Sequence, residues 1–175
     1  MSISAAVRQG EVAIEFSEGI GRKAAEGKLT IGQLLGGPSV FGDLAKADAF
    51  DSYAWHQVTS HGIPMKAIWS LQEGCFPHTS EGFFNLIGMS LRTAQRKKST
   101  ASPRTTSDIA ESAVALAKTI TRSVQVFGSA DKAQEWWMRP NPSLDGAKPI
   151  MLMRSRLGAD VVDNTLTAIE HGFFA

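Results

Sequence analysis

The chain has 175 residues, of which 43% are hydrophobic and 20% charged, so it can bury a core and is not disordered as a whole. Its net charge of +1 excludes a uniformly basic protein, and binding to nucleic acid would need a local basic cluster. The single cysteine, Cys75, cannot form an intramolecular disulfide, which is typical of the reducing cytoplasm, where we expect the protein to work. The N-terminal residues lack the apolar stretch of a signal peptide, and no run approaches the roughly 20 apolar residues that span a bilayer, so we expect no membrane association.

Residues 1–30 are expected to form an N-terminal arm. Within it, Val12, Ile14 and Phe16 alternate with less apolar neighbours, which is the period of a half-buried β-strand. A single short strand is not stable alone, so it would have to pair with another segment, for example in a second copy of the chain. A frayed arm is the alternative, and the sequence does not separate the two.

From Thr30 onward the apolar residues recur at spacings of three and four, which predicts an all-α fold. Three helices are expected in the first half, over TIGQLLGG, DAFDSYAWHQVTSHGIP and PMKAIWSLQEG. In the second of these, Asp48 is expected to cap the N-terminus, while Phe50, Ala54 and Val58 share the buried face.

The longest predicted helix runs from residue 107 to residue 127, with Ser107 as its N-cap. One apolar stripe follows it for about twenty residues: Ile109, Ala113, Leu116, Ile120, Val124 and Phe127. A short helix capped by Ser129 should follow and end in Trp136 and Trp137. These two side chains point about 100° apart, so at least one should be partly exposed or at an interface. A last helix is expected to end at Gly172.

The stretch TSEGFFNLIGMSLRTAQRKK predicts two short helices divided at Gly88, with Thr79 or Ser80 capping the first and Ser90 the second. No acidic residue occurs from residue 82 to residue 107, and five basic ones do: Arg92, Arg96, Lys97, Lys98 and Arg104. This arrangement fits a helix-turn-helix whose second helix contacts DNA. The expected contacts are Ser90, Arg92, Thr93, Gln95, Arg96, Lys97 and Lys98. The alternative is a solvated basic helix followed by a loop.

Catalytic chemistry is poorly supported by the sequence. The four histidines lack the spacing of a zinc site, and the one cysteine has no C-x-x-C partner. The glycine-rich stretches EGIGRKAAEG and LGGPSVFG follow no convincing strand and are expected to be turns. No plausible acid/base pair is evident, so we expect neither an enzyme nor a bound cofactor or metal, and no catalytic residue is assigned.

From residue 126 to the last residue, the sequence resembles the C-terminal toxin-binding domain of Xre/MbcA/ParS-like antitoxins. The shared elements occur in one order over about fifty residues: Phe127-Gly128, Ala133, Trp136, Pro140-Asn141, Leu144, Gly146, Pro149, Gly158, Val162, Leu166 and Ile169 to Gly172. Upstream, HGIP and LIGMSLRTAQRKK resemble the Xre-type helix-turn-helix of the same family. The chain departs from the pattern at Trp137, where leucine is usual, and in a longer, more polar connector over residues 99–107.

The resemblance implies a type II antitoxin that neutralises a RES-domain, NAD-degrading toxin by covering its active site. It also implies a repressor that binds its own operator DNA, as a homodimer within a larger toxin–antitoxin complex. The implied organisation is an arm over 1–30, a helical region with the helix-turn-helix over 31–125, and a toxin-binding domain over 126–175. A stand-alone helix-turn-helix regulator without a toxin is the alternative. The expected toxin contacts are Trp136, Ile169, Glu170, His171, Gly172, Phe173, Phe174 and Ala175.

Overall fold

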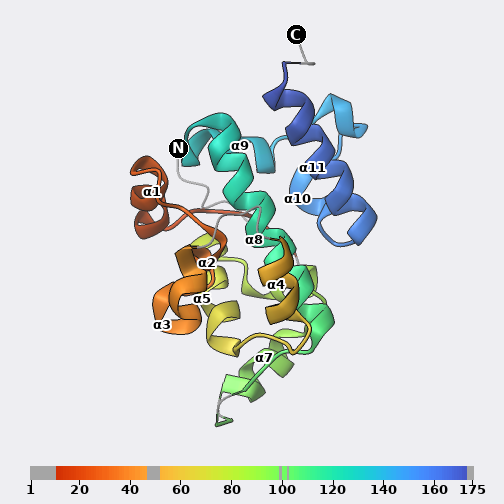
Figure 1. The fold of residues 1–175 in the computed structure, drawn as a ribbon. Helices are drawn as coiled ribbons and strands as arrows, with labels where there is room; N and C mark the ends of the chain where they lie inside the picture. Colours follow the sequence, from red (N-terminus) through yellow and green to blue (C-terminus); the bar gives the residue numbers. More distant parts are fainter. Residues whose placement is uncertain (1–10, 47–51, 99, 102, 173–175) are drawn as a thin grey trace.

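The computed structural model describes residues 11–46, 52–98, 100–101 and 103–172, and these form an all-α fold (Figure 1). Within them only Pro64 and Arg104 form a β-bridge, and no strand is present. The α-helices are α1 (Glu18–Ala25), α2 (Ile31–Leu34), α3 (Pro38–Phe41), α4 (Ser52–Thr59), α5 (Met65–Cys75), α6 (Ser80–Leu86), α7 (Leu91–Lys98), α8 (Ser107–Phe127), α9 (Ala130–Met138), α10 (Pro149–Leu152) and α11 (Arg156–Glu170). Two short 3-10 helices, η1 (Gly42–Lys46) and η2 (Pro142–Leu144), complete the fold.

Helix α8 is the central element, and it packs against α2, α4, α9 and α11. Its predicted stripe is confirmed, because Ala113, Leu116 and Ile120 are fully buried. The predicted N-cap is wrong by one residue: Ser107 is the first helical residue, and Thr106 holds the cap position with extended backbone. In Figure 1 the helix passes through the middle of the molecule, with α7 at one end and the end of α11 at the other.

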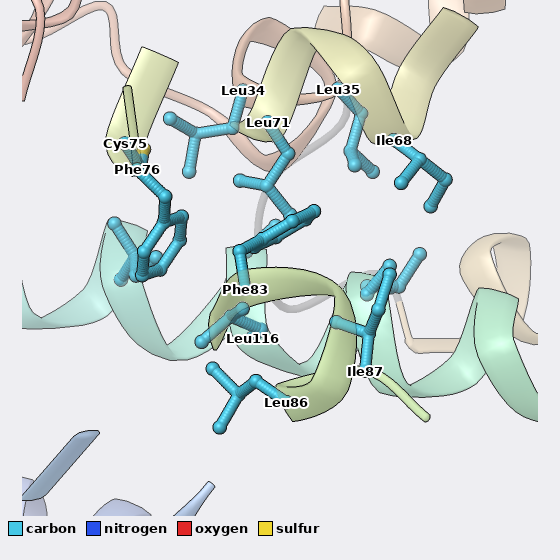
Figure 2. Packing of buried hydrophobic residues seen from close by; sticks show 14 of the residues in the cluster. Leu34, Leu35, Ile68, Leu71, Cys75, Phe76, Phe83, Leu86, Ile87 and Leu116 are labelled. Atoms are coloured by element: carbon cyan, nitrogen blue, oxygen red, sulfur yellow. The ribbon is translucent and has the colours of Figure 1, made fainter. Parts of the chain in front are cut away.

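The largest part of the core lies where α2, α5 and α6 meet α8. Figure 2 shows side chains from these helices pointing toward one another, among them Leu71, Phe83 and Leu116. The core continues without a break into the C-terminal part, where Trp137, Ile150 and Val162 are also fully buried. One core therefore serves both halves of the described chain.

Residues 11–17 are extended but do not form the predicted strand. The alternation is nevertheless correct, because Val12 and Ile14 are each only 1% exposed. Neither predicted alternative holds for this segment, since it is not frayed and its backbone bonds within the same chain. The Glu15 amide donates to the Cys75 carbonyl at 2.8 Å, and the Ser17 amide to the Gly74 carbonyl at 2.9 Å. Carbonyl groups at the end of α5 thus accept the bonds that a neighbouring strand would accept.

Both ends of this extended segment also contact the C-terminal half. The Phe16 amide donates to the side-chain oxygen of Gln134 on α9 at 2.9 Å. The Glu11 carboxylate lies 3.7 Å from the Lys148 ammonium. On the other side the segment passes directly over α6, where a Cβ added to Gly82 would lie 2.5 Å from the Glu11 carbonyl oxygen. The segment therefore joins the helix pair α6–α7 to the C-terminal helices.

Some details of the N-terminal half differ from the prediction. Helix α1 was not predicted, because its two glycines weaken the helical pattern, yet Ile20 anchors it by packing against Gly74 of α5. In α4 the buried face holds Trp55 and Thr59, whereas Ala54 and Val58 are half-buried. The predicted cap at residue 48 and the core position at residue 50 lie outside the described residues.

Candidate DNA-binding and toxin-binding surfaces

Helices α6 and α7 form two short helices joined by a tight turn, as the sequence predicts. Gly88 has φ of 80°, a left-handed conformation that favours glycine at this turn. Thr79 holds the predicted cap position of α6 but makes no cap bond, because its hydroxyl accepts from the Ala13 amide at 3.2 Å and donates to the Ala13 carbonyl at 2.9 Å. Ala94 is fully buried, and its small side chain lets α7 approach the helices beneath it. The pair is therefore anchored on one face and has its other face toward solvent.

The predicted DNA contacts fall into three groups, of which the two lysines form the last. The side chains of Arg92, Gln95 and Arg96 are exposed, so they lie on the solvent face of α7. The hydroxyls of Ser90 and Thr93 pair with each other at 2.9 Å, and Ser90 accepts from the Thr93 amide at 3.1 Å. Ser90 therefore caps α7 as predicted, and its hydroxyl is already engaged in this structure.

The two lysines expected at phosphates fold back onto their own chain. The Lys97 ammonium donates to the Arg104 carbonyl at 2.8 Å. The Lys98 ammonium lies 4.5 Å from the centroid of the Trp69 ring. An exposed cation–π contact contributes roughly 0.5–1 kcal/mol, so moving this lysine to a phosphate would cost little.

The connector after α7 is fixed to the turn between α4 and α5. Thr105 and Ile63 exchange two bonds at 2.9 Å, one from each backbone amide. The Arg104 guanidinium donates to the carbonyl oxygen of Gly62. Gly62 has φ of 70°, and a Cβ there would lie 2.0 Å from the Thr105 carbonyl oxygen. The long polar connector thus ends in an ordered contact that sets where α8 begins.

The two tryptophans of α9 have different environments, as their angular separation predicts. Trp137 is fully buried, and its Nε1 donates to the Ser123 hydroxyl of α8 at 2.9 Å. Trp136 is half-buried and packs on Phe127 and Trp137, with ring centroids 5.5 and 5.3 Å away. The Nε1 of Trp136 is buried without a hydrogen-bond partner among the described residues. Trp137 is therefore the tryptophan that holds α9 against α8.

An arginine that the sequence analysis did not single out fixes α11 on α8. The Arg122 guanidinium lies 2.6 Å from the Asp163 carboxylate and 3.2 Å from the Glu170 carboxylate, and it donates to the Thr167 hydroxyl at 2.8 Å. Burial lowers the pKa of Arg122, but the hydrogen bonds and negative charges of Asp163 and Glu170 outweigh it and raise the pKa above its ordinary value. The guanidinium therefore stays charged and holds three positions along α11.

The structure describes the predicted toxin contacts only up to Gly172, and they differ in exposure. Ile169 is half-buried, while Glu170 and His171 are exposed at the end of α11. Glu170 is also engaged by Arg122, as described above. Gly172 has φ of 71° and ends the helix as predicted. The predicted contacts at residues 173–175 lie outside the described residues.

A cleft of about 690 Å³ lies between α4, α8 and the start of α11. Its lining mixes basic and acidic side chains, including Lys118, Arg156, Glu111 and Asp160. The described lining residues include no hydroxyl or thiol hydrogen-bonded to a histidine ring.

The single cysteine lies away from this cleft, in the core. Burial raises the pKa of the Cys75 thiol far above its ordinary value, so this thiol is unreactive.

Across 11–46, 52–98, 100–101 and 103–172, no three His, Cys, Asp or Glu side chains gather where they could hold a metal ion. Nor does any helix within these ranges have the length and apolar character needed to cross a membrane.

The C-terminal helices α9, α10 and α11 thus pack on one another and on the end of α8. Residues 122–172 match the family described as the antitoxin Xre/MbcA/ParS C-terminal toxin-binding domain. The resemblance of the C-terminal part of the chain to these antitoxins is therefore confirmed. The match begins at Arg122 and leaves residues 1–121 outside it. No curated protein matches the chain.

Proposed function

We propose that this chain neutralises a RES-domain, NAD-degrading toxin by covering its active site, and that it represses its own operon through helices α6 and α7. The observation that carries the proposal is the match of residues 122–172 to a toxin-binding domain of antitoxins. The matched segment starts at the arginine that clamps α11 and includes all of α9, α10 and α11. It therefore covers the end of α8 together with the helices that follow it.

Repression is supported by the helix pair. Arg92 and Arg96 lie one turn apart on the exposed side of α7, where they are spaced for guanine edges in a major groove. Gln95 lies beside them and suits an adenine edge. An Xre-type repressor matches a two-fold operator by forming a homodimer, so we propose a dimer as the DNA-binding form.

Neutralisation is assigned to the end of α11 and the residues after it. A toxin that binds NAD must offer apolar walls for the rings and cationic groups for the pyrophosphate. The segment from Ile169 to residue 175 provides two phenylalanines, whose rings complement the apolar walls of such a cleft. Trp136 acts behind this segment as support.

The test is co-expression with a RES-domain protein, should the adjacent reading frame encode one, read out as cell growth and cellular NAD. The full chain should restore both, and a chain lacking residues 173–175 should restore neither. As a control, the truncated chain should retain the unfolding temperature and operator affinity of the full chain. Full neutralisation by the truncated chain would refute the tail mechanism. Operator binding without any complex with the adjacent product would favour a stand-alone regulator.

A further inference from the structure

Helix α11 carries an exposed apolar strip on the side that faces away from α8. Leu157 is 79% exposed and Val161 is 46% exposed. With Tyr53, they are the exposed large hydrophobic side chains of the described residues. Their spacing of four residues places Leu157 and Val161 one turn apart on the same helix face. This pair, the 157/161 strip, lies within the segment that matches the toxin-binding domain.

The strip cannot turn inward, because the other sides of α11 already pack in the core or form ion pairs with α8. Val162 and Leu166 are fully buried, and they point to the opposite side of the helix. The ion pairs of Arg122 with Asp163 and Glu170 fix the rotation of α11 about its axis. The strip is therefore presented on a rigid helix, which reduces the entropy lost on binding a partner.

The start of α11 is held equally firmly. Gly158 lies so close to α10 that a Cβ there would be 2.0 Å from the Leu152 carbonyl oxygen. Ser155 caps the helix by accepting from the Gly158 amide at 3.0 Å. These contacts place Leu157 in the first, well-anchored turn, so its exposure is not the result of a fraying helix end.

The surroundings of the strip indicate a protein partner. Polar and charged side chains border it, and those of Arg154, Arg156, Asp160 and Asn164 are exposed. An apolar centre with a polar rim is the usual anatomy of a protein–protein interface. Contacts to DNA are made mainly by basic and polar groups, so a leucine–valine strip is better suited to a protein surface.

A stable complex also needs more buried area than the last residues of the sequence can supply. A specific interface buries about 800 Å² on each partner. Aromatic side chains bury roughly 150–250 Å² each, so the two phenylalanines of the tail would supply about 300–500 Å². The tail alone therefore falls short. The strip begins thirteen residues before the end of α11, which is about 20 Å along the helix and within the span of one interface.

We propose that the 157/161 strip is the anchoring surface for the toxin, separate from the tail that covers the active site. The inference rests on the proposed toxin partnership and adds a second contact to it. The strip supplies affinity by burying Leu157 and Val161 against an apolar patch of the toxin. The tail supplies inhibition.

The test compares Leu157→Glu and Val161→Glu, singly and together, with Gln125→Glu as a matched control. Gln125 is exposed on α8, and its substitution adds the same charge within the same domain. A glutamate at residue 157, in the first turn of α11, is compatible with the helix dipole, so the fold should be retained. Unfolding temperatures of all variants check this directly. Affinity for the purified RES-domain product of the adjacent reading frame is measured by calorimetry, and self-association by light scattering.

We expect the double variant to bind the toxin at least about 30-fold more weakly, which corresponds to the loss of one hot-spot contact, while Gln125→Glu binds as the wild type does. Wild-type affinity in the double variant would overturn the assignment of the strip as an anchoring surface and leave the proposed toxin partnership intact. Loss of self-association with unchanged toxin affinity would also overturn it, and would make the strip a contact between copies. A wild-type chain that does not bind the toxin would overturn the partnership itself.

Discussion

Replacing Trp137 with phenylalanine should destabilise the protein by about 2 kcal/mol. The substitution removes the 2.9 Å bond from Nε1 to the Ser123 hydroxyl, and a buried neutral hydrogen bond contributes about 1 kcal/mol. It also removes about 50 Å² of buried aromatic surface, which is worth about 1.2 kcal/mol at 25 cal/mol per Å². The Ser123 hydroxyl keeps its bond to the Ile120 carbonyl at 2.7 Å, so no unsatisfied donor is added. For a chain of this length, 2 kcal/mol corresponds to a fall of about 4–8 °C in Tm.

The neighbouring tryptophan provides the control. Trp136→Phe loses no hydrogen bond, since Nε1 of Trp136 has no partner among the described residues. Removing this buried donor should offset much of the lost ring contact, so Tm should change by less than half as much as in Trp137→Phe. Both variants are compared by thermal unfolding followed by circular dichroism at 222 nm. Equal losses, or a larger loss in Trp136→Phe, would refute the assignment of Trp137 as the tryptophan that joins α9 to α8.

Three further predictions follow from the contacts described. Arg92→Ala and Arg96→Ala should each weaken operator binding by about 1–3 kcal/mol if they contact bases. Lys98→Ala should weaken binding to all DNA sequences alike and flatten the salt dependence of binding. Titrations of operator and unrelated DNA at several salt concentrations separate these outcomes. Gly82→Ala places a Cβ 2.5 Å from a backbone oxygen, so limited proteolysis should cleave residues 11–17 faster than in the wild type, and an unchanged rate would contradict the close packing. Arg122→Met should lower the free energy of unfolding in urea by about 1–3 kcal/mol, because three charge-assisted bonds to partly exposed groups are lost; a loss below 0.5 kcal/mol would show that packing alone positions α11.

The elements predicted well from the sequence are those with several periods of pattern. Helix α8 has 21 residues and its stripe follows it for most of that length, so an error in one position cannot shift the buried face. In α4, with eight residues, the apolar positions fit two neighbouring faces, and the prediction favoured Ala54 and Val58 over Trp55. Short helices contain too few turns for the pattern to fix their rotation.

Contacts between distant elements were not predictable for a different reason. Trp136 and Trp137 had to face different ways, but their spacing carried no information about which one would meet Ser123. Arg122 lies 41 residues before Asp163, and nothing in the sequence gives the relative rotation of α8 and α11. The alternation of Val12 and Ile14 revealed their burial but not the carbonyl groups of α5 that replace a partner strand.

The continuity of α8 limits how such proteins can exchange parts. Its 21 residues span about 31 Å and belong to both halves of the molecule. A chimaera that joins the first half of one antitoxin to the toxin-binding domain of another must be spliced inside or beside this helix. A misalignment of one residue turns everything beyond the joint by about 100° and shifts it by about 1.5 Å, which would take Gln134 of α9 away from the Phe16 amide. Successful recombination is therefore restricted to joints that conserve the helical phase of α8 between the two halves.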